Sequence, residues 1–453
     1  MKKVLPYLIV VIIIGFVIFL FTRPSRTTET TEDNSTKVQS TDPPSLPSSE
    51  KMDKKSEKPN INIYMENSGS MDGYVTINSE FKDALGNIVV QSHNGYAKKS
   101  NFYFINNDIH PIDTTIFGYD MNNFVAHLSP KSMKIGHTES TNINDIFKII
   151  LSKTDKKTVS VLFSDCVYSI KGSDIASQIN NAKNATMGAF MDALDKNPEL
   201  GVIILQCQSD FNGYYYDRND KPILYRGKRP YYVFFIGDVK YLQDINTKMD
   251  LNNSQTGIHG LLHKYMLSNK VWTVDDNSAR TITSDYTNAS LIKTERNFFD
   301  IHEISTDRSA SSSTITFAVG VDMQNLFVDE SYIQDPANYS VKQPGCSVYG
   351  IQKITSNMPA FSDMSDFSDS NRLYAIKIKT NDNQPQFDIC LQNILPKWVN
   401  DANIPDDSGI VPDGSKTFAI SSMIEGIYDA FYHKISYDNK NIFNFSINIK
   451  EYN

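Results

Sequence analysis

Residues Asn60 to Met71 read NINIYMENSGSM, and this stretch decides the fold that we predict. Its first six residues are suited to a short apolar strand, and the chain then enters a glycine-containing loop. Glu66, Ser68 and Ser70 stand at alternate positions of that loop. One carboxylate and two hydroxyls with this spacing can point their oxygens at one place. Oxygen ligands suit a hard divalent cation such as Mg²⁺, Mn²⁺ or Ca²⁺.

Two further polar groups follow in an order that fits the same site. The segment His137 to Asn142, which reads HTESTN, precedes a predicted helix over Ile143 to Leu151, and Asp165 follows a buried strand over Thr158 to Phe163. In α/β sheets, ligands bind beyond the carboxyl ends of the strands. We therefore expect the polar groups that follow these strands to lie at one edge of a sheet.

The surrounding sequence, residues 60–270, alternates strand and helix signals. Continuous apolar runs at Gly201 to Cys207 and Tyr231 to Ile236 are typical of strands that are covered on both faces of a parallel sheet. Helical spacing is predicted over Ile77 to Ser92, Met121 to Leu128, Asp174 to Lys196, Val239 to Leu251 and Gly257 to Leu267. This alternation predicts a doubly wound α/β domain.

Residues 271–453 have a different character. Strand signals recur at Thr314 to Val321, Tyr374 to Thr380, Gln386 to Leu391 and Ile442 to Ile449, with turn-forming residues between them. One helical segment, Ser421 to His433, interrupts them. The pattern predicts a β-rich C-terminal domain, a β-sandwich.

The amino terminus carries an uncharged run of 18 residues from Val4 to Phe21, long enough to nearly cross a bilayer as a helix. No small-residue cleavage site follows it, so residues 1–22 are predicted to be a transmembrane signal anchor. Residues 23–59 are rich in Ser, Thr, Pro and charge and are predicted to be a disordered stalk. The flanking charges are almost balanced, but the stalk favours a single-pass membrane protein with an extracytoplasmic body. A disordered tail on a cytoplasmic protein is the alternative.

The overall charge narrows the possible partners. The formal charge is −8 and the chain has no basic face, which argues against nucleic-acid binding. The Asn-, Lys-, Ile- and Ser-rich composition is compatible with a bacterial source. Four cysteines, with neither zinc spacing nor a Cys-x-x-Cys pair, give no metal site.

The arrangement of these groups resembles the von Willebrand factor A family, whose metal-ion-dependent adhesion site uses Asp-x-Ser-x-Ser, a later Thr and an Asp that ends a central strand. The resemblance covers roughly residues 60–270. It implies that Glu66, Ser68, Ser70, Thr141 and Asp165 hold a divalent cation and that a carboxylate of a protein partner completes the coordination shell. Glu66 replaces the family Asp, and Cys166 stands where a Gly commonly follows the strand-end Asp.

The family sheet order would make the strands ending at Phe163 and Cys207 neighbours. Cys166 and Cys207 could then form a disulfide, or remain two buried free thiols.

These observations predict a membrane-anchored protein-binding protein rather than an enzyme. The alternative is a metal-independent structural component of a membrane, envelope or defence complex. A metal-dependent hydrolase is favoured least, because the sequence offers no distinctive nucleophile or general base.

Several weaker signals are assigned structural roles. His259 and His263, four apart on a predicted helix, lack the Glu of a zinc motif. Ser79 and Lys82 are predicted to lie on a helix surface, and Asp72 and Asp210 in turns or surface loops. Asp406 and Asp407 are expected to be solvated in a loop, and the tyrosines Tyr214, Tyr215 and Tyr216 to form a solvent-facing hairpin that could meet a partner.

Overall fold

The computed structural model describes residues 57–113, 120–138, 142–253, 255–274, 278–284, 300–301, 314–380, 386–433 and 440–449. The predicted anchor, nearly all of the predicted stalk and Thr141 lie outside these ranges. Contacts from Glu57 onward group as one compact unit, separate from Met1–Ser56. Among the described helices, none has the length and apolar character needed to cross a bilayer.

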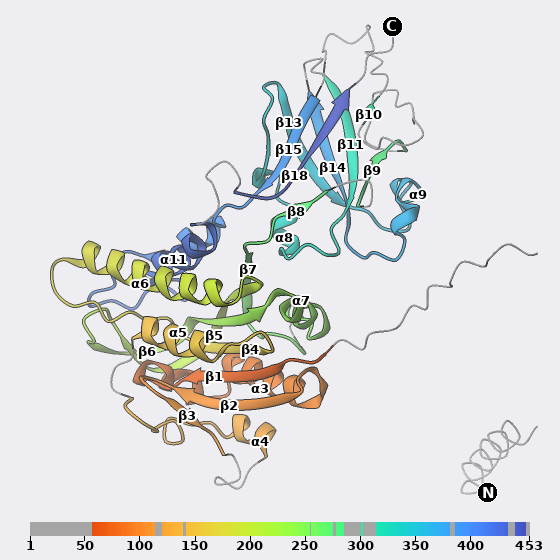
Figure 1. Cartoon of the computed structure of the whole chain (residues 1–453). Coiled ribbons are helices and arrows are strands. Elements are labelled where there is room, and N and C mark those ends of the chain that lie inside the picture. The colour runs from red at the N-terminus through yellow and green to blue at the C-terminus, as the bar shows by residue number, and fades with distance from the viewer. Residues whose placement is uncertain are drawn as a thin grey trace, which may run out of the picture. The chain divides into compact units, whose positions relative to one another are not determined.

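The first sheet has seven strands in the order β3-β2-β1-β4-β6-β5-β7 (Figure 1). Only β1 with its two neighbours β2 and β4 is parallel; the other pairs are antiparallel. The strands are β1 Asn60–Glu66, β2 Lys99–Ile105, β3 Ile109–Pro111, β4 Thr158–Ser164, β5 Leu200–Tyr216, β6 Pro222–Asp238 and β7 Leu261–Ser268.

The sheet differs from the parallel one expected from the apolar runs. Strands β5 and β6 are 17 residues long and pair along their whole length as an antiparallel hairpin, which places β6 between β4 and β5. Cys166 and Cys207 are therefore not on neighbouring strands, and both are buried free thiols. A buried antiparallel strand and a buried parallel strand have the same apolar composition, so the sequence pattern did not separate them.

Helices cover both faces of this sheet, as predicted. Ile63 and Met65 of β1 face one core with α2, α3, α4 and α7, whereas Tyr64 faces the other core with α5 and α6. The segments are η1 Gly69–Met71, α2 Asp72–Val75, α3 Glu80–Gln91, η2 Ser92–Tyr96, α4 Met121–Ala126, α5 Ile143–Lys153, α6 Ile175–Lys196 and α7 Val239–Lys248.

Two local predictions were wrong. The predicted helix over Gly257 to Leu267 is largely strand β7, because its apolar residues fit either period and pairing with β5 decides between them. Ser79 and Lys82 are buried rather than on a helix surface. Ser79 caps α3 by accepting from the Lys82 amide, and the Lys82 ammonium donates to the carbonyls of Ala126 and Leu128.

Two more sheets follow, and their strands bury one shared apolar core. One has the order β10-β18-β15-β12, with β8 also pairing β18, and the other the order β13-β14-β11-β9. The strands are β8 Trp272–Thr273, β9 Ala279–Ile282, β10 Asp300–Ile301, β11 Ile315–Asp322, β12 Tyr339–Val341, β13 Cys346–Lys353, β14 Leu373–Thr380, β15 Gln386–Gln392 and β18 Asn441–Ile449. Short helices between them are α8 Glu330–Ile333, η4 Pro336–Asn338, α9 Ala360–Asp363 and η5 Ser365–Phe367.

Between β15 and β18 the chain returns to the first sheet. This segment contains α10 Lys397–Asp401, β16 Asn403–Ile404, β17 Thr417–Phe418 and α11 Ile420–Tyr432. Helix α11 corresponds to the predicted Ser421 to His433 helix and lies beside α6, where it joins the core of the first sheet (Figure 1). The Lys183 ammonium of α6 pairs with Glu425 and Asp429 of α11, at 3.0 and 2.9 Å. Part of the predicted C-terminal domain thus completes the core of the α/β sheet.

Candidate functional site

The predicted loop residues and the end of β4 come together at the carboxyl edge of the first sheet. The Ser68 hydroxyl donates to Glu66 Oε1 at 2.6 Å, and the Ser164 hydroxyl donates to Glu66 Oε2 at 2.5 Å. The Ser68 and Ser70 hydroxyl oxygens are 3.0 Å apart, and Ser70 also hydrogen-bonds Asp165. We call Glu66, Ser68, Ser70, Ser164 and Asp165 the carboxyl-edge cluster.

The loop after β1 is fixed by its neighbours. The Asn67 side-chain amide donates to the carbonyls of Met133 and Ile135, both at 2.8 Å, and its oxygen accepts from Asn106. The Gly69 amide donates to the Thr138 carbonyl at 3.1 Å. Four of the five predicted site residues are thereby brought together. Thr141 lies outside the described residues.

Burial controls the charge of the cluster. Glu66 is 6% exposed and Asp165 is 2% exposed. Burial, followed by the charge of Asp165, raises the pKa of Glu66 to about 7, against the opposing hydrogen bonds from Ser164 and Ser68. Burial also raises the pKa of Asp165, and here the Ser70 hydrogen bond and the charge of Arg229 oppose it. Burial therefore favours the protonated form of both acids, and each carboxylate disfavours ionisation of the other.

Cys166 adopts a backbone conformation that glycine prefers. Its φ is +56°, in the left-handed region, and it stands where the resembled family commonly has Gly. The turn lets the Cys166 amide donate to the Ser164 hydroxyl at 2.9 Å. The turn after Asp165 therefore keeps the backbone conformation that suits Gly, although Cys occupies position 166. A residue with a Cβ atom is strained in this conformation.

Arg229 of β6 was missed by the sequence analysis. It is 1% exposed, and its guanidinium carbon lies 4.2 Å from the centre of the Tyr215 ring. Neither terminal nitrogen has a hydrogen-bond acceptor among the described residues. The signal was available: Arg229 and Pro230 immediately precede the YYVFFI run, so a charge continues a buried strand.

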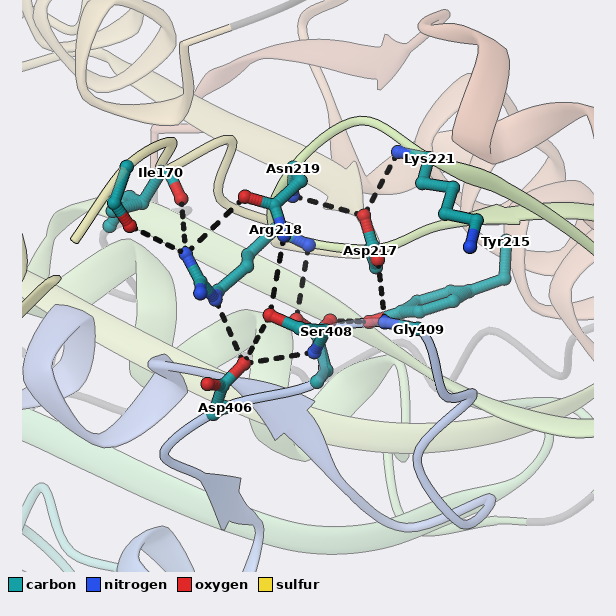
Figure 2. Close-up of polar contacts among 11 residues, drawn as sticks. Ile170, Tyr215, Asp217, Arg218, Asn219, Lys221, Asp406, Ser408 and Gly409 are labelled. Atoms are coloured by element: carbon teal, nitrogen blue, oxygen red, sulfur yellow. Dashed lines mark hydrogen bonds and ion pairs between the residues drawn. The ribbon is translucent and has the colours of Figure 1, made fainter.

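A second group of buried acids joins the end of the β5–β6 hairpin to the returning segment. Asp407 accepts from the Tyr215 hydroxyl and, at 3.0 Å, from the Arg218 amide. Asp406 accepts from Arg218 Nε at 2.8 Å, and Asp217 accepts from the Gly409 amide at 2.7 Å (Figure 2). We call Tyr215, Asp217, Arg218, Asp406 and Asp407 the hairpin clamp.

The clamp corrects one prediction and supports another. Asp407 is fully buried, so the expectation that solvent explains it was wrong, whereas Asp406 is exposed as expected. The sequence could not separate the two neighbours, because the contact that buries Asp407 comes from a hairpin nearly 200 positions earlier in the chain.

The other residues that the sequence analysis singled out lie in packing contacts, ion pairs or surface positions. His263 lies on β7, not on a helix, and stacks on Trp398 with ring centres 5.4 Å apart. Asp210 pairs with Lys228 at 3.0 Å. The three tyrosines are divided, because Tyr215 is buried in the clamp while Tyr214 is 52% exposed. Asp72 lies at the start of α2, and burial raises its pKa.

The cluster fits a divalent cation in the type of its oxygen donors but not in its charge. Both Glu66 oxygens already accept serine hydroxyls, and the buried guanidinium of Arg229 is close enough to oppose the rise in the pKa of Asp165. A hard cation needs ionised carboxylates and gains nothing from a second positive charge nearby. We therefore derive no step through a metal ion.

The comparisons with known proteins add no assignment to this geometry. No protein-family model, no curated protein and no solved structure matches the chain.

Proposed function

We propose that this chain is a membrane-anchored protein-binding protein that contacts its partner at the carboxyl edge of an A-type α/β domain. One observation carries the proposal. The β5–β6 hairpin continues past the last residue of β4, and it bears an exposed cross-strand pair, Tyr214 at 52% and Leu224 at 72%. Exposed aromatic and aliphatic groups that lie together are typical of protein contact sites.

The hairpin that bears this pair reaches the loop of the carboxyl-edge cluster. Tyr216, two residues after Tyr214, lies against Gly69 of the loop that carries Ser68 and Ser70. A partner seated on the hairpin would therefore also meet the edge where the resembled family binds its ligands. The helices on both sheet faces and the core shared by the two C-terminal sheets support the finer proposal of an A-type domain followed by a β-sandwich.

The membrane anchor is part of the proposal and has its own test. Val4 to Phe21 would span the bilayer, and the stalk would hold the body outside the cytoplasm. Alkaline carbonate should leave the chain in the membrane pellet. External protease should cut the body on spheroplasts, because their intact cytoplasmic membrane protects only cytoplasmic domains. Extraction into the carbonate supernatant contradicts the anchor.

Site-specific photocrosslinking tests the contact site. A photoreactive residue at position 214 of the full-length chain, expressed in its own cells, should give a discrete adduct that mass spectrometry identifies. Tyr349 on β13, 41% exposed, is the matched control position. We expect the adduct at 214 only, and its loss with Leu224→Ser. Equal adducts at both positions, or none at 214, contradict the proposed edge.

A second candidate function has a specific observation in its favour. The buried guanidinium beside Asp165 suits a metal-independent structural component of a membrane, envelope or defence complex better than a cation-bridged adhesion protein. Crosslinking at position 214 in the presence of EDTA distinguishes the two functions. EDTA should prevent the adduct if a cation bridges the contact, and should leave its yield unchanged if the contact is independent of metal.

A further inference from the structure

Arg229 lies on the same side of the sheet as Asp165, on the adjacent strand. Ser164, the last residue of β4, pairs with Tyr232 of β6. Continued antiparallel pairing brings Asp165 opposite Tyr231, and alternate residues of a strand share a face, so Arg229 and Asp165 point to one face. Arg229 is two residues along β6 from Tyr231, a distance of roughly 7 Å. The side chains of Arg229 and Asp165 are together long enough to cover this distance.

The surroundings of Arg229 give its charge little local compensation. The Tyr74 hydroxyl, which is close by, donates to the Pro230 carbonyl at 2.5 Å, and the Tyr215 ring stacks on the guanidinium. Burial raises the pKa values of Tyr74 and Tyr215, so both stay neutral and neither balances the charge of the guanidinium. A guanidinium cannot lose its proton in a protein, so burial has to be offset by an acid. The charge of Arg229 lowers the pKa values of two carboxyl groups, those of the buried Asp165 and the exposed Asp413.

We propose that Arg229 supplies, from within the chain, the positive charge that the resembled family takes from a divalent cation. Glu66, Ser68, Ser70 and Asp165 keep the layout of an oxygen-ligand site, and the guanidinium balances the buried acids from the β6 side. A cation entering at Asp165 would meet a fixed positive charge in a low-dielectric interior, which weakens its binding. The inference rests on the candidate site and does not depend on which partner the hairpin contacts.

Mn²⁺ binding to the purified full-length chain in detergent tests this assignment. Free Mn²⁺ is measured by electron paramagnetic resonance, and thermal unfolding is followed in parallel. The wild-type chain should show no saturable site at the cluster. Arg229→Met removes the charge and leaves its size, and should raise the Mn²⁺ affinity at least about tenfold, in line with the ~1–3 pKa-unit effect of a neighbouring charge. Arg229→Lys keeps the charge and should behave as the wild type.

Asp165→Asn shows whether the Mn²⁺ binds at the carboxyl-edge cluster, and it measures the charge coupling between Asp165 and Arg229, which a change in packing alone would not produce. In the Arg229→Met background, Asp165→Asn should abolish the new Mn²⁺ binding. In a double-mutant cycle, Asp165→Asn should destabilise the wild-type chain more than the Arg229→Met chain, because only the former retains an unbalanced buried cation.

One result overturns the inference even if Arg229→Met does not fold. A saturable Mn²⁺ site in the wild-type chain that Asp165→Asn removes would show that the cluster binds a cation despite Arg229. Additive effects in the double-mutant cycle would equally contradict the charge pairing. Neither result bears on the crosslinked adduct at Tyr214, so this inference and the proposed protein contact fail independently.

Discussion

The carboxyl-edge cluster and the hairpin clamp both bury acids, but they satisfy them in different ways. In the clamp, Asp407 and Asp217 accept from backbone amides and a tyrosine hydroxyl, and Asp406 accepts from an arginine. In the cluster, both Glu66 oxygens accept serine hydroxyls, and the terminal nitrogens of the neighbouring Arg229 have no acceptor among the residues that the structure describes. Acids with complete sets of hydrogen-bond donors indicate a structural contact. A buried guanidinium that lacks hydrogen-bond acceptors, and that only a neighbouring acid balances, indicates a site that can still take part in function.

Asp406 of the clamp and Glu66 of the cluster have pKa values that move in opposite directions, whereas burial raises the pKa of the clamp's Asp407 as it does that of Glu66. Hydrogen bonds from Ser408, followed by the interaction with Arg218, lower the pKa of Asp406 to about 2. Burial raises the pKa of Glu66 to about 7. The clamp therefore favours ionised acid at its exposed end, and the cluster favours a protonated acid in its interior.

The largest expected effect is in the clamp. Asp407→Ala leaves the buried Tyr215 hydroxyl and the Arg218 amide without their acceptor, and should lower the free energy of unfolding by about 4 kcal/mol. Urea unfolding of the full-length chain measures it. The neighbouring Asp406→Ala, on an exposed side chain, should cost under about 1 kcal/mol. Equal losses would show that the clamp does not distinguish its two acids.

The pH profile of stability should carry contributions of opposite sign from Glu66 and Asp406. The folded pKa of Glu66, about 7, lies above its usual value of 4.5. Its contribution to stability, up to about 3 kcal/mol, is therefore full below about pH 4.5 and lost as the pH rises through 7. The folded pKa of Asp406, about 2, lies below 3.8. Its contribution is present above about pH 4 and lost as the pH falls toward 2.

Urea unfolding across roughly pH 2 to 9 measures both contributions. Glu66→Gln should flatten the profile near neutral pH and leave the acid side unchanged, and Asp406→Asn should do the reverse. A Glu66→Gln profile that still falls through neutral pH would assign the titration to another group.

A smaller effect is expected from the hydroxyl that bridges β1 and β4. Ser164→Ala removes the donor to Glu66 and the acceptor of the Cys166 amide, and should cost about 2 kcal/mol. Carbon NMR should also find the pKa of Glu66 raised further. Ser160→Ala, on the same strand and equally buried, removes hydrogen bonds with Thr154 and Tyr64 and should cost about 1 kcal/mol without moving the pKa of Glu66.

The smallest effect concerns the turn after Asp165. Cys166 has a φ of +56°, which glycine adopts without strain. Cys166→Gly should therefore be more stable than Cys166→Ala by about 1 kcal/mol, although both lose the buried thiol. Chemical unfolding of the two variants in parallel gives the difference. The reverse order would mean that the turn is not held in the left-handed region.

Local patterns predicted the site better than the sheet. Local sequence gives the alternate spacing of Glu66, Ser68 and Ser70 and the position of Asp165 at a strand end. These residues place their oxygens at one edge of the sheet because β1 and β4 are parallel neighbours. The β5–β6 pairing is a long-range fact, since a buried strand reads the same in either direction. The charge of Arg229 beside an apolar run was a visible signal of a buried charge, but which acid it faces depends on its neighbours across the sheet.

The sequence by itself determined the strand β1, the loop after it, the strand-end Asp165 and the helices over both faces, because these depend on periodicity and on which residues can end a strand. Tertiary structure alone decided that β6 separates β4 from β5, that Asp407 is buried while Asp406 is exposed, and that Arg229 lies on the face of Asp165. Each of these features depends on contacts between segments far apart in the chain. The residues that bury Asp407 or balance the charge of Arg229 cannot be identified from the local sequence around either residue.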